Sequence, residues 1–184
     1  MDQENKKDEL VNKGGRKMTE ALNASNEQED SEEDTQHGRF LTFAIGHEFF
    51  GISIQYVKEI IGIQPIIEVP EVPNYVKGII NLRGSIIPVI DVRLKFKKDF
   101  LDYNDRTCII VIEIRDVLVG LIVDNVSDVL KINDDNIVPP PDIKTGFHNK
   151  YIKGIGMVNK EVKLLLDCEK ILDDEELETI KNAG

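Results

Sequence analysis

The feature that most constrains the fold of this chain is an internal repeat. A shift of 69 residues (from 51 to 120) places Gly51-Ile52 on Gly120-Leu121. Beyond a proline-containing loop the shift becomes 76 residues (from 75 to 151) and places Tyr75–Ile79, YVKGI, on Tyr151–Ile155, YIKGI. Because ordered matches at two consistent shifts rarely arise by chance, we predict two related halves.

The first half begins with a predicted β-hairpin. Apolar and small residues run from Phe40 to Ile45, Gly46-His47-Glu48 follows as a turn, and Phe49–Ile54 returns as a second strand. A short helix is predicted over Ile54–Ile61, because three aliphatic residues in it fall on one helical face.

A loop and a second hairpin complete this half. Prolines at 65, 70 and 73 interrupt regular structure. Two strands are then predicted at Val76–Leu82 and Ser85–Val92, joined at Arg83-Gly84. The repeat predicts the same order in the second half, and an acidic first turn predicts a C-terminal helix over about 173–182. Since an open sheet of four or five strands leaves reactive edges, each half is expected to close into a small barrel.

Composition agrees with a β-rich core. Aromatic residues make up 6% of the chain and tryptophan is absent, so the core must be built from Ile, Val and Leu. Cys108 and Cys168 each lie in an apolar run and are expected to be reduced thiols. The net charge of -11 argues against binding nucleic acid or anionic lipid. There is no apolar run of about 20 residues and no secretory signal, so we expect a cytoplasmic protein without membrane insertion.

The first 37 residues differ in composition from the rest. Within residues 23–37 the only aliphatic side chain is that of Ala24, and Glu, Asp, Gln, Asn and Ser dominate. Such a segment buries too little apolar surface to offset its ordering entropy. We therefore predict a disordered acidic tail over 1–37 and a folded domain over 38–184. Its two intertwined barrel subdomains are expected at about 38–105 and 106–172.

No pattern in the sequence indicates catalysis, a metal or a cofactor. Three histidines, His37, His47 and His148, are scattered and suit no metal site, and phosphate-binding and nucleophile motifs are absent. Asp91 and Asp167 occupy matching places in the two halves. We interpret them as strand-ending residues that accept backbone N–H bonds rather than as an acid–base pair. Catalytic, metal and cofactor sites are therefore all predicted to be absent.

The central motif carries a resemblance to a known family. Gly78–Gly84 (GIINLRG), continued by Ile87–Arg93, is similar to the signature of the CheW family of bacterial chemotaxis adaptors. Further similarity lies in Val57–Ile60, Leu121–Val129 and Tyr151–Gly154, and the resemblance covers about residues 38–182. It implies an all-β fold of two five-stranded SH3-like barrels, related by duplication, with a hydrophobic groove between them and short helices.

The resemblance also implies a function. In the family the groove takes the cytoplasmic tip of a chemoreceptor, and the protein binds the regulatory domain of the CheA histidine kinase. We therefore expect a non-enzymatic scaffold, monomeric alone and part of receptor arrays at the inner membrane. The alternatives are the same fold inside a larger signalling protein, a nucleic-acid-binding double barrel, or an enzyme. The 147 residues left after the tail (184 minus 37) leave no room for a larger signalling protein. The acidic balance argues against nucleic-acid binding, and the missing nucleophile–base pattern argues against an enzyme.

Nine residues are predicted to contact protein partners. The resemblance implies that Glu59 and Arg83 pair and help to shape the receptor-facing surface, on which Val57 and Val129 also lie. From pattern alone, the aliphatic residues of this set would be expected in the core. The glycines of the set, and Gly120 outside it, would be expected to allow tight turns or close backbone approach. The complete set is Val57, Glu59, Ile60, Gly78, Asn81, Arg83, Gly84, Val126 and Val129.

Overall fold

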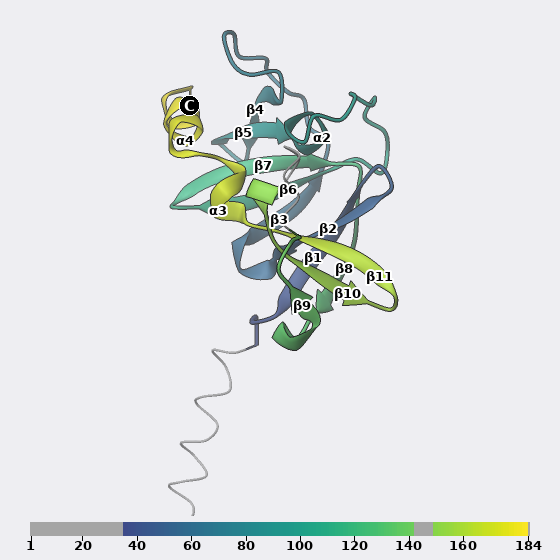
Figure 1. The fold of residues 1–184 in the computed structure, drawn as a ribbon. Coiled ribbons are helices and arrows are strands. Elements are labelled where there is room, and N and C mark those ends of the chain that lie inside the picture. The colour runs from purple at the N-terminus through teal and green to yellow at the C-terminus, as the bar shows by residue number, and fades with distance from the viewer. Residues whose placement is uncertain (1–34, 142–148, 184) are drawn as a thin grey trace, which may run out of the picture. The chain divides into compact units, whose positions relative to one another are not determined.

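The computed structural model describes residues 35–141 and 149–183 (Figure 1). The predicted tail therefore lies almost wholly outside the described residues, as does His148. Short helices and 3-10 turns join the strands. The strands are β1 (Arg39–Ile45), β2 (Glu48–Ser53), β3 (Val57–Gly62), β4 (Val76–Leu82), β5 (Ser85–Asp91), β6 (Cys108–Ile114), β7 (Val117–Val123), β8 (Asn125–Lys131), β9 (Ile137–Val138), β10 (Ile152–Val158) and β11 (Glu161–Leu166). The other elements are η1 (Ile54–Tyr56), α2 (Val92–Lys95), η2 (Asp134–Asn136), η3 (Asn149–Tyr151), α3 (Cys168–Ile171) and α4 (Asp174–Ala183).

The strands form two sheets, which confirms the predicted all-β class. One sheet has the order β8-β1-β2-β11-β10-β9 and the other the order β3-β6-β7-β5-β4. Neighbouring strands are antiparallel except for β2 with β11 and β5 with β7. The first sheet has six strands because the two-residue β9 pairs with the outer edge of β10.

The two halves exchange strands. By the repeat, β3 of the first half corresponds to β8 of the second, yet β3 pairs with β6 and β8 pairs with β1. The six-stranded sheet therefore takes strands from residues 39–53 and 125–166, and the five-stranded sheet from residues 57–123. Each sheet needs strands from both halves.

The predicted helix over Ile54–Ile61 is wrong. Only the 3-10 turn η1 is helical there, and β3 follows with alternating exposure from Val57 to Gly62. Residues 57, 60 and 61 fit a helical face, but their backbone pairs with β6, with a register shift between Val57 and Glu59. Pairing with a distant strand thus overrides the local periodicity.

Three clusters of buried side chains hold the fold together. The largest joins both sheets and includes Phe43 and Ile52 of one and Ile110 and Leu121 of the other. A second cluster around Ile80 belongs to the five-stranded sheet, and a third around Leu165 and Phe40 to the six-stranded sheet. The clusters are rich in Ile, Val and Leu, as the composition predicts.

The C-terminal helix is confirmed as α4, within one residue of its predicted ends. Its start is a capping box. The Asp173 carboxylate accepts a 2.8 Å hydrogen bond from the Glu176 N–H, and the Glu176 carboxylate accepts one of 2.9 Å from the Asp173 N–H. Leu177 then enters the central core with 4% of its surface exposed.

The two aspartates at matching places cap short helices. The Asp91 carboxylate accepts a 3.1 Å hydrogen bond from the Leu94 N–H at the start of α2. The Asp167 carboxylate accepts one of 3.1 Å from the Glu169 N–H at the start of α3. The prediction that they bind backbone N–H groups is confirmed.

Candidate protein-binding site

The Glu59–Arg83 pair joins the two ends of the five-stranded sheet. Glu59 lies on β3, the first strand of the sheet order, and Arg83 lies in the turn after β4, the last strand. The guanidinium donates two hydrogen bonds of 2.8 Å, one to each carboxylate oxygen. The predicted pairing is confirmed, and its two parallel bonds fix the position of Arg83.

The turn that carries Arg83 is shaped by its neighbours. Arg83 and Gly84 have φ values of 53° and 91°, which is the backbone that tight hairpin turns require at both central positions. The Asn81 side-chain oxygen accepts a 2.8 Å hydrogen bond from the Gly84 N–H. Asn81 and Gly84 therefore hold the turn that presents Arg83 to solvent, where 73% of its side chain is exposed.

The pair shifts the titration of both groups. Hydrogen bonds from Arg83 hold the pKa of the Glu59 carboxyl below its usual range, and the same bonds raise the pKa of Arg83. Both groups thus stay charged at neutral pH.

We expect the Glu59 carboxyl to titrate below the ordinary glutamate value of about 4.3 in the intact protein. Arg83→Ala should return it to that value, because the lowering comes from the guanidinium. NMR titration of side-chain carboxyl carbons measures both. An unchanged Glu59 pKa in the variant would show that the pair does not persist in solution.

The four aliphatic residues of the predicted set divide between core and surface. Val57 and Val126, related by the repeat, are half-buried and pack against the central core. Ile60 and Val129, also related by the repeat, are 43% and 48% exposed. They lie on β3 and β8, each of which ends its sheet order. Strands β3 and β8 therefore each present one aliphatic side chain to solvent.

Gly78 is buried and has a structural role. Its φ is 135°, and a Cβ there would overlap the carbonyl oxygen of Ile67. Ile67 and Ile79 exchange two backbone hydrogen bonds of 2.9 Å. Gly78 thus lets the proline loop lie against β4. The close packing predicted for Gly120 is also found, between Ile109 and Val89.

Two further features of the structure were not predicted from the sequence. A cavity of about 390 Å³ has Glu59 and Arg83 on its wall, together with Leu82 and Leu118. The alternation of apolar residues in these strands could have indicated that Leu82 faces inward. It could not have indicated which strands come together to form the cavity. Lys58 and Glu113 also line the cavity and form an ion pair.

The second feature is a polar bridge between the sheets. Arg93 donates hydrogen bonds of 2.5 and 3.2 Å to Asp124, which also accepts one of 2.7 Å from the Gly46 N–H in the β1–β2 turn. Asp124 is the residue between β7 and β8, where the chain passes from one sheet to the other. Its hydrogen bond raises the pKa of Arg93. Arg93 and Asp124 both lie in the segments that resemble the CheW family, and this resemblance was the signal that could have indicated them.

Within residues 35–141 and 149–183, no group of three or more His, Cys, Asp or Glu side chains could hold a metal ion. Cys108 and Cys168 are free thiols, as predicted, and burial raises the pKa of Cys168 to about 12. No helix in this described part is long and apolar enough to cross a membrane.

The chain is similar to a known protein family. Residues 39–176 match the CheW-like domain. The chemotaxis protein CheW of Klebsiella aerogenes is 36% identical over 151 residues, covering 82% of this chain and 91% of that protein. CheW of Helicobacter pylori is 36% identical over 149 residues, covering 81% and 88%.

A solved structure agrees with these matches. The crystal structure of the scaffolding protein TtCheW from Thermoanaerobacter tengcongensis superposes with a TM-score of 0.70 at 31% identity, covering 76% of this chain and 96% of that one. The duplicated SH3-like β-fold, the Glu59–Arg83 turn and these similarities together show that the chain belongs to the CheW family of chemotaxis scaffolding proteins.

Proposed function

We propose that this protein couples chemoreceptors to a CheA-type histidine kinase and catalyses no reaction. The observation that carries the proposal is the doubly hydrogen-bonded Glu59–Arg83 pair on the wall of the 390 Å³ cavity. It fixes a charged surface beside β3, whose Ile60 is exposed. A hydrophobic groove bordered by such residues can take the apolar face of a helical partner.

The proposed mechanism is bridging in the cytoplasm. The receptor tip binds in a groove between the barrels, as the family resemblance implies, while a barrel surface contacts the regulatory domain of the kinase. Kinase control follows from different affinities for the active and inactive arrangements. The protein is monomeric alone, and its weak contacts become strong within an array at the inner membrane because linked sites raise effective concentration.

The function is tested by co-sedimentation of kinase with receptor-containing membranes. We expect the kinase to sediment, and its autophosphorylation to rise, only when this protein is added. Receptor membranes without the protein, and protein without receptor, are the controls. A protein that binds neither receptor nor kinase would disprove the coupling role.

Arg83→Ala should reduce kinase recruitment to receptor membranes roughly tenfold or more, the effect of removing an important interface arginine. The fold should remain intact, because Arg83 lies at the surface. Recruitment is measured across a concentration series. Arg115→Ala is the matched control, since Arg115 is also exposed and binds two carboxylates, those of Glu169 and Asp174. Equal recruitment by both variants would contradict the assignment.

A further inference from the structure

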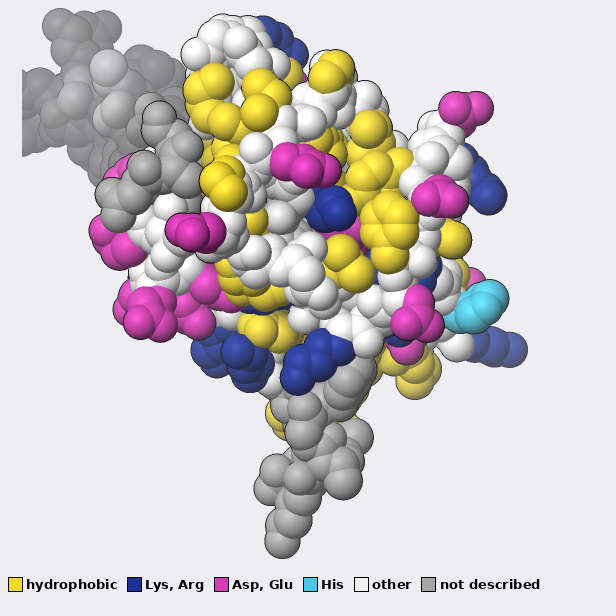
Figure 2. Space-filling view, turned by 90° about the horizontal axis from the view of Figure 1, so that it is seen from above, with side chains coloured by type: hydrophobic (Ala, Val, Ile, Leu, Met, Phe, Trp, Pro, Cys, Tyr) yellow, Lys and Arg dark blue, Asp and Glu magenta, His cyan; other side chains and the backbone are white. Residues whose placement is uncertain are grey.

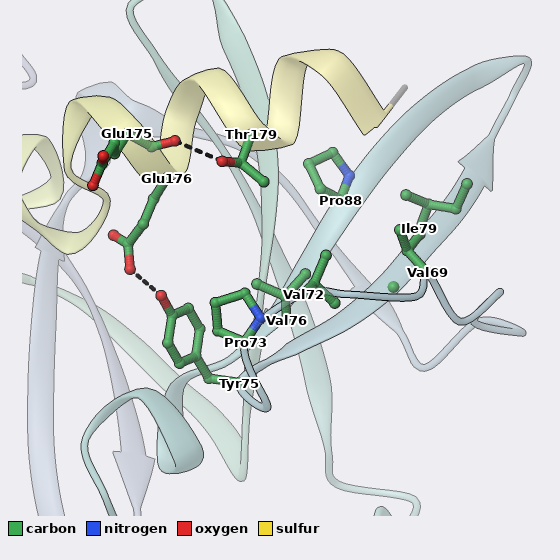
Figure 3. Close-up of a pocket in the computed structure, with 11 residues that line it drawn as sticks. Val69, Val72, Pro73, Tyr75, Val76, Ile79, Pro88, Glu175, Glu176 and Thr179 are labelled. Carbon is green, nitrogen blue, oxygen red and sulfur yellow. Dashed lines mark hydrogen bonds between the residues drawn. The ribbon is translucent and has the colours of Figure 1, made fainter.

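A second cavity lies between α4 and the proline loop, apart from the Glu59–Arg83 surface. Its volume is about 290 Å³, and no residue lines both cavities. Figure 3 shows α4 along one side and the loop and β4 along the other. The apolar part of its wall is formed by Val69, Val72, Pro73, Val76, Ile79 and Pro88.

Hydrogen bonds hold both walls of this cavity in place. On the helix side, the Glu176 carboxylate accepts hydrogen bonds from Lys95 and Tyr75 (Figure 3 shows the bond from Tyr75). On the loop side, Ile67 is bonded twice to Ile79 at 2.9 Å. The bond from Tyr75, next to β4, joins the two walls, and the bonds of Ile67 hold the loop on β4.

The charges around the cavity indicate what enters it. Glu68 and Glu71 are exposed next to the lining residues of the loop, and Glu175 is exposed on α4. Two lysines near the cavity have partners of their own: Lys95 binds Glu176, and the ammonium of Lys77 lies 5.1 Å from the centre of the Phe100 ring. Figure 2, the view from above, shows acidic side chains, and some basic ones, set among hydrophobic ones.

We propose that this cavity binds an aliphatic side chain of a partner protein whose segment carries lysine or arginine beside it. A volume of 290 Å³ lies at the lower limit of pockets for small-molecule ligands, about 300 to 1,000 Å³, and suits a side chain better than a cofactor. The apolar walls supply the burial, and the acidic rim selects for cationic neighbours and against anionic ones. The surface is additional to the one proposed for receptor and kinase coupling.

The test uses two tetrapeptides with blocked ends, Lys-Ile-Leu-Lys and Glu-Ile-Leu-Glu, added to the full chain with labelled methyl groups. We expect saturable NMR shifts at Val72, Val76 and Ile79 with the basic peptide, which should bind about tenfold more tightly than the acidic one. Thr179→Phe, which fills the cavity from an exposed helix position, should abolish the shifts. Asn136→Phe, on exposed η2, should leave them unchanged.

Three results would overturn the proposal: no saturable shift with either peptide, equal affinity for both, or binding that survives Thr179→Phe. Equal affinity would show a non-selective apolar surface. Since neither receptor nor kinase is present in this assay, its result is independent of the coupling test.

Discussion

Gly78→Ala should lower the free energy of unfolding by roughly 2 to 6 kcal/mol, combining backbone strain with overpacking. The φ of 135° is strained for any residue with a Cβ, and that atom would lie 2.8 Å from the carbonyl carbon of Ile67. Since the obstacle is backbone, relief requires the proline loop to leave β4. Chemical denaturation, followed by circular dichroism, measures the change.

Two other glycines serve as controls for this prediction. Gly62→Ala should change stability by less than about 0.5 kcal/mol, because nothing lies within 4 Å of the new Cβ. Gly154 occupies the repeat position of Gly78 (78 plus 76), but it lacks the positive φ, and its Cβ would meet a side-chain atom, Cγ2 of Ile137, at 2.6 Å. Gly154→Ala should therefore cost less than Gly78→Ala. Equal stability of the Gly78 and Gly62 variants would refute the structural role of Gly78.

Glu176→Ala should lower the free energy of unfolding by about 3 to 5 kcal/mol, because it leaves the Lys95 ammonium buried without its counter-charge. Only 4% of the Lys95 side chain is exposed. Its ammonium lies 4.1 Å from the centre of the Tyr75 ring and 5.6 Å from that of Tyr151, which are repeat partners. The pair thus ties α4 to both halves of the chain.

The repeat suggests the compensating change. Lys95 corresponds to the fully buried Ile171 (95 plus 76), so this fold accepts an aliphatic side chain at that place. Lys95→Ile combined with Glu176→Gln should recover most of the lost stability. No buried charge then remains, and the side-chain amide oxygen of the new glutamine can accept a hydrogen bond from the Tyr75 hydroxyl. Urea denaturation of the three proteins measures this. A double variant as unstable as Glu176→Ala would show that the loss is not due to the orphaned charge.

The same pair predicts a pH dependence. Burial raises the pKa of Glu176, but hydrogen bonds from Lys95 and Tyr75 outweigh it and hold that pKa below its usual range. A lowered folded-state pKa gives stability that is present above the unfolded value, about 4.3, and is lost as pH falls through the folded value. Below about pH 4 the native protein should therefore lose free energy of unfolding relative to the double variant. A stability difference that is independent of pH would argue against the ion pair.

Much of the site could be anticipated from sequence, but its members' roles could not. The motif residues Glu59 and Arg83 were predicted to pair, and they do. Val57 and Ile60 looked alike in pattern, yet one packs on the core and the other is exposed. Gly78, which was predicted to contact a partner, is buried. Burial depends on which distant segment covers a residue, and local pattern does not contain that information.

By itself, the sequence determined the duplication, the β-rich class, most strand positions and the C-terminal helix. These depend on alternation, turn residues and caps, which act over a few neighbouring residues. Tertiary structure alone decided that the β1–β2 and β6–β7 hairpins exchange between halves, that residues 57–62 form a strand, and that α4 borders a cavity. Because the two halves carry nearly the same pattern, pairing within a half and pairing across halves satisfy it equally, and only contacts between residues far apart in the chain distinguish them.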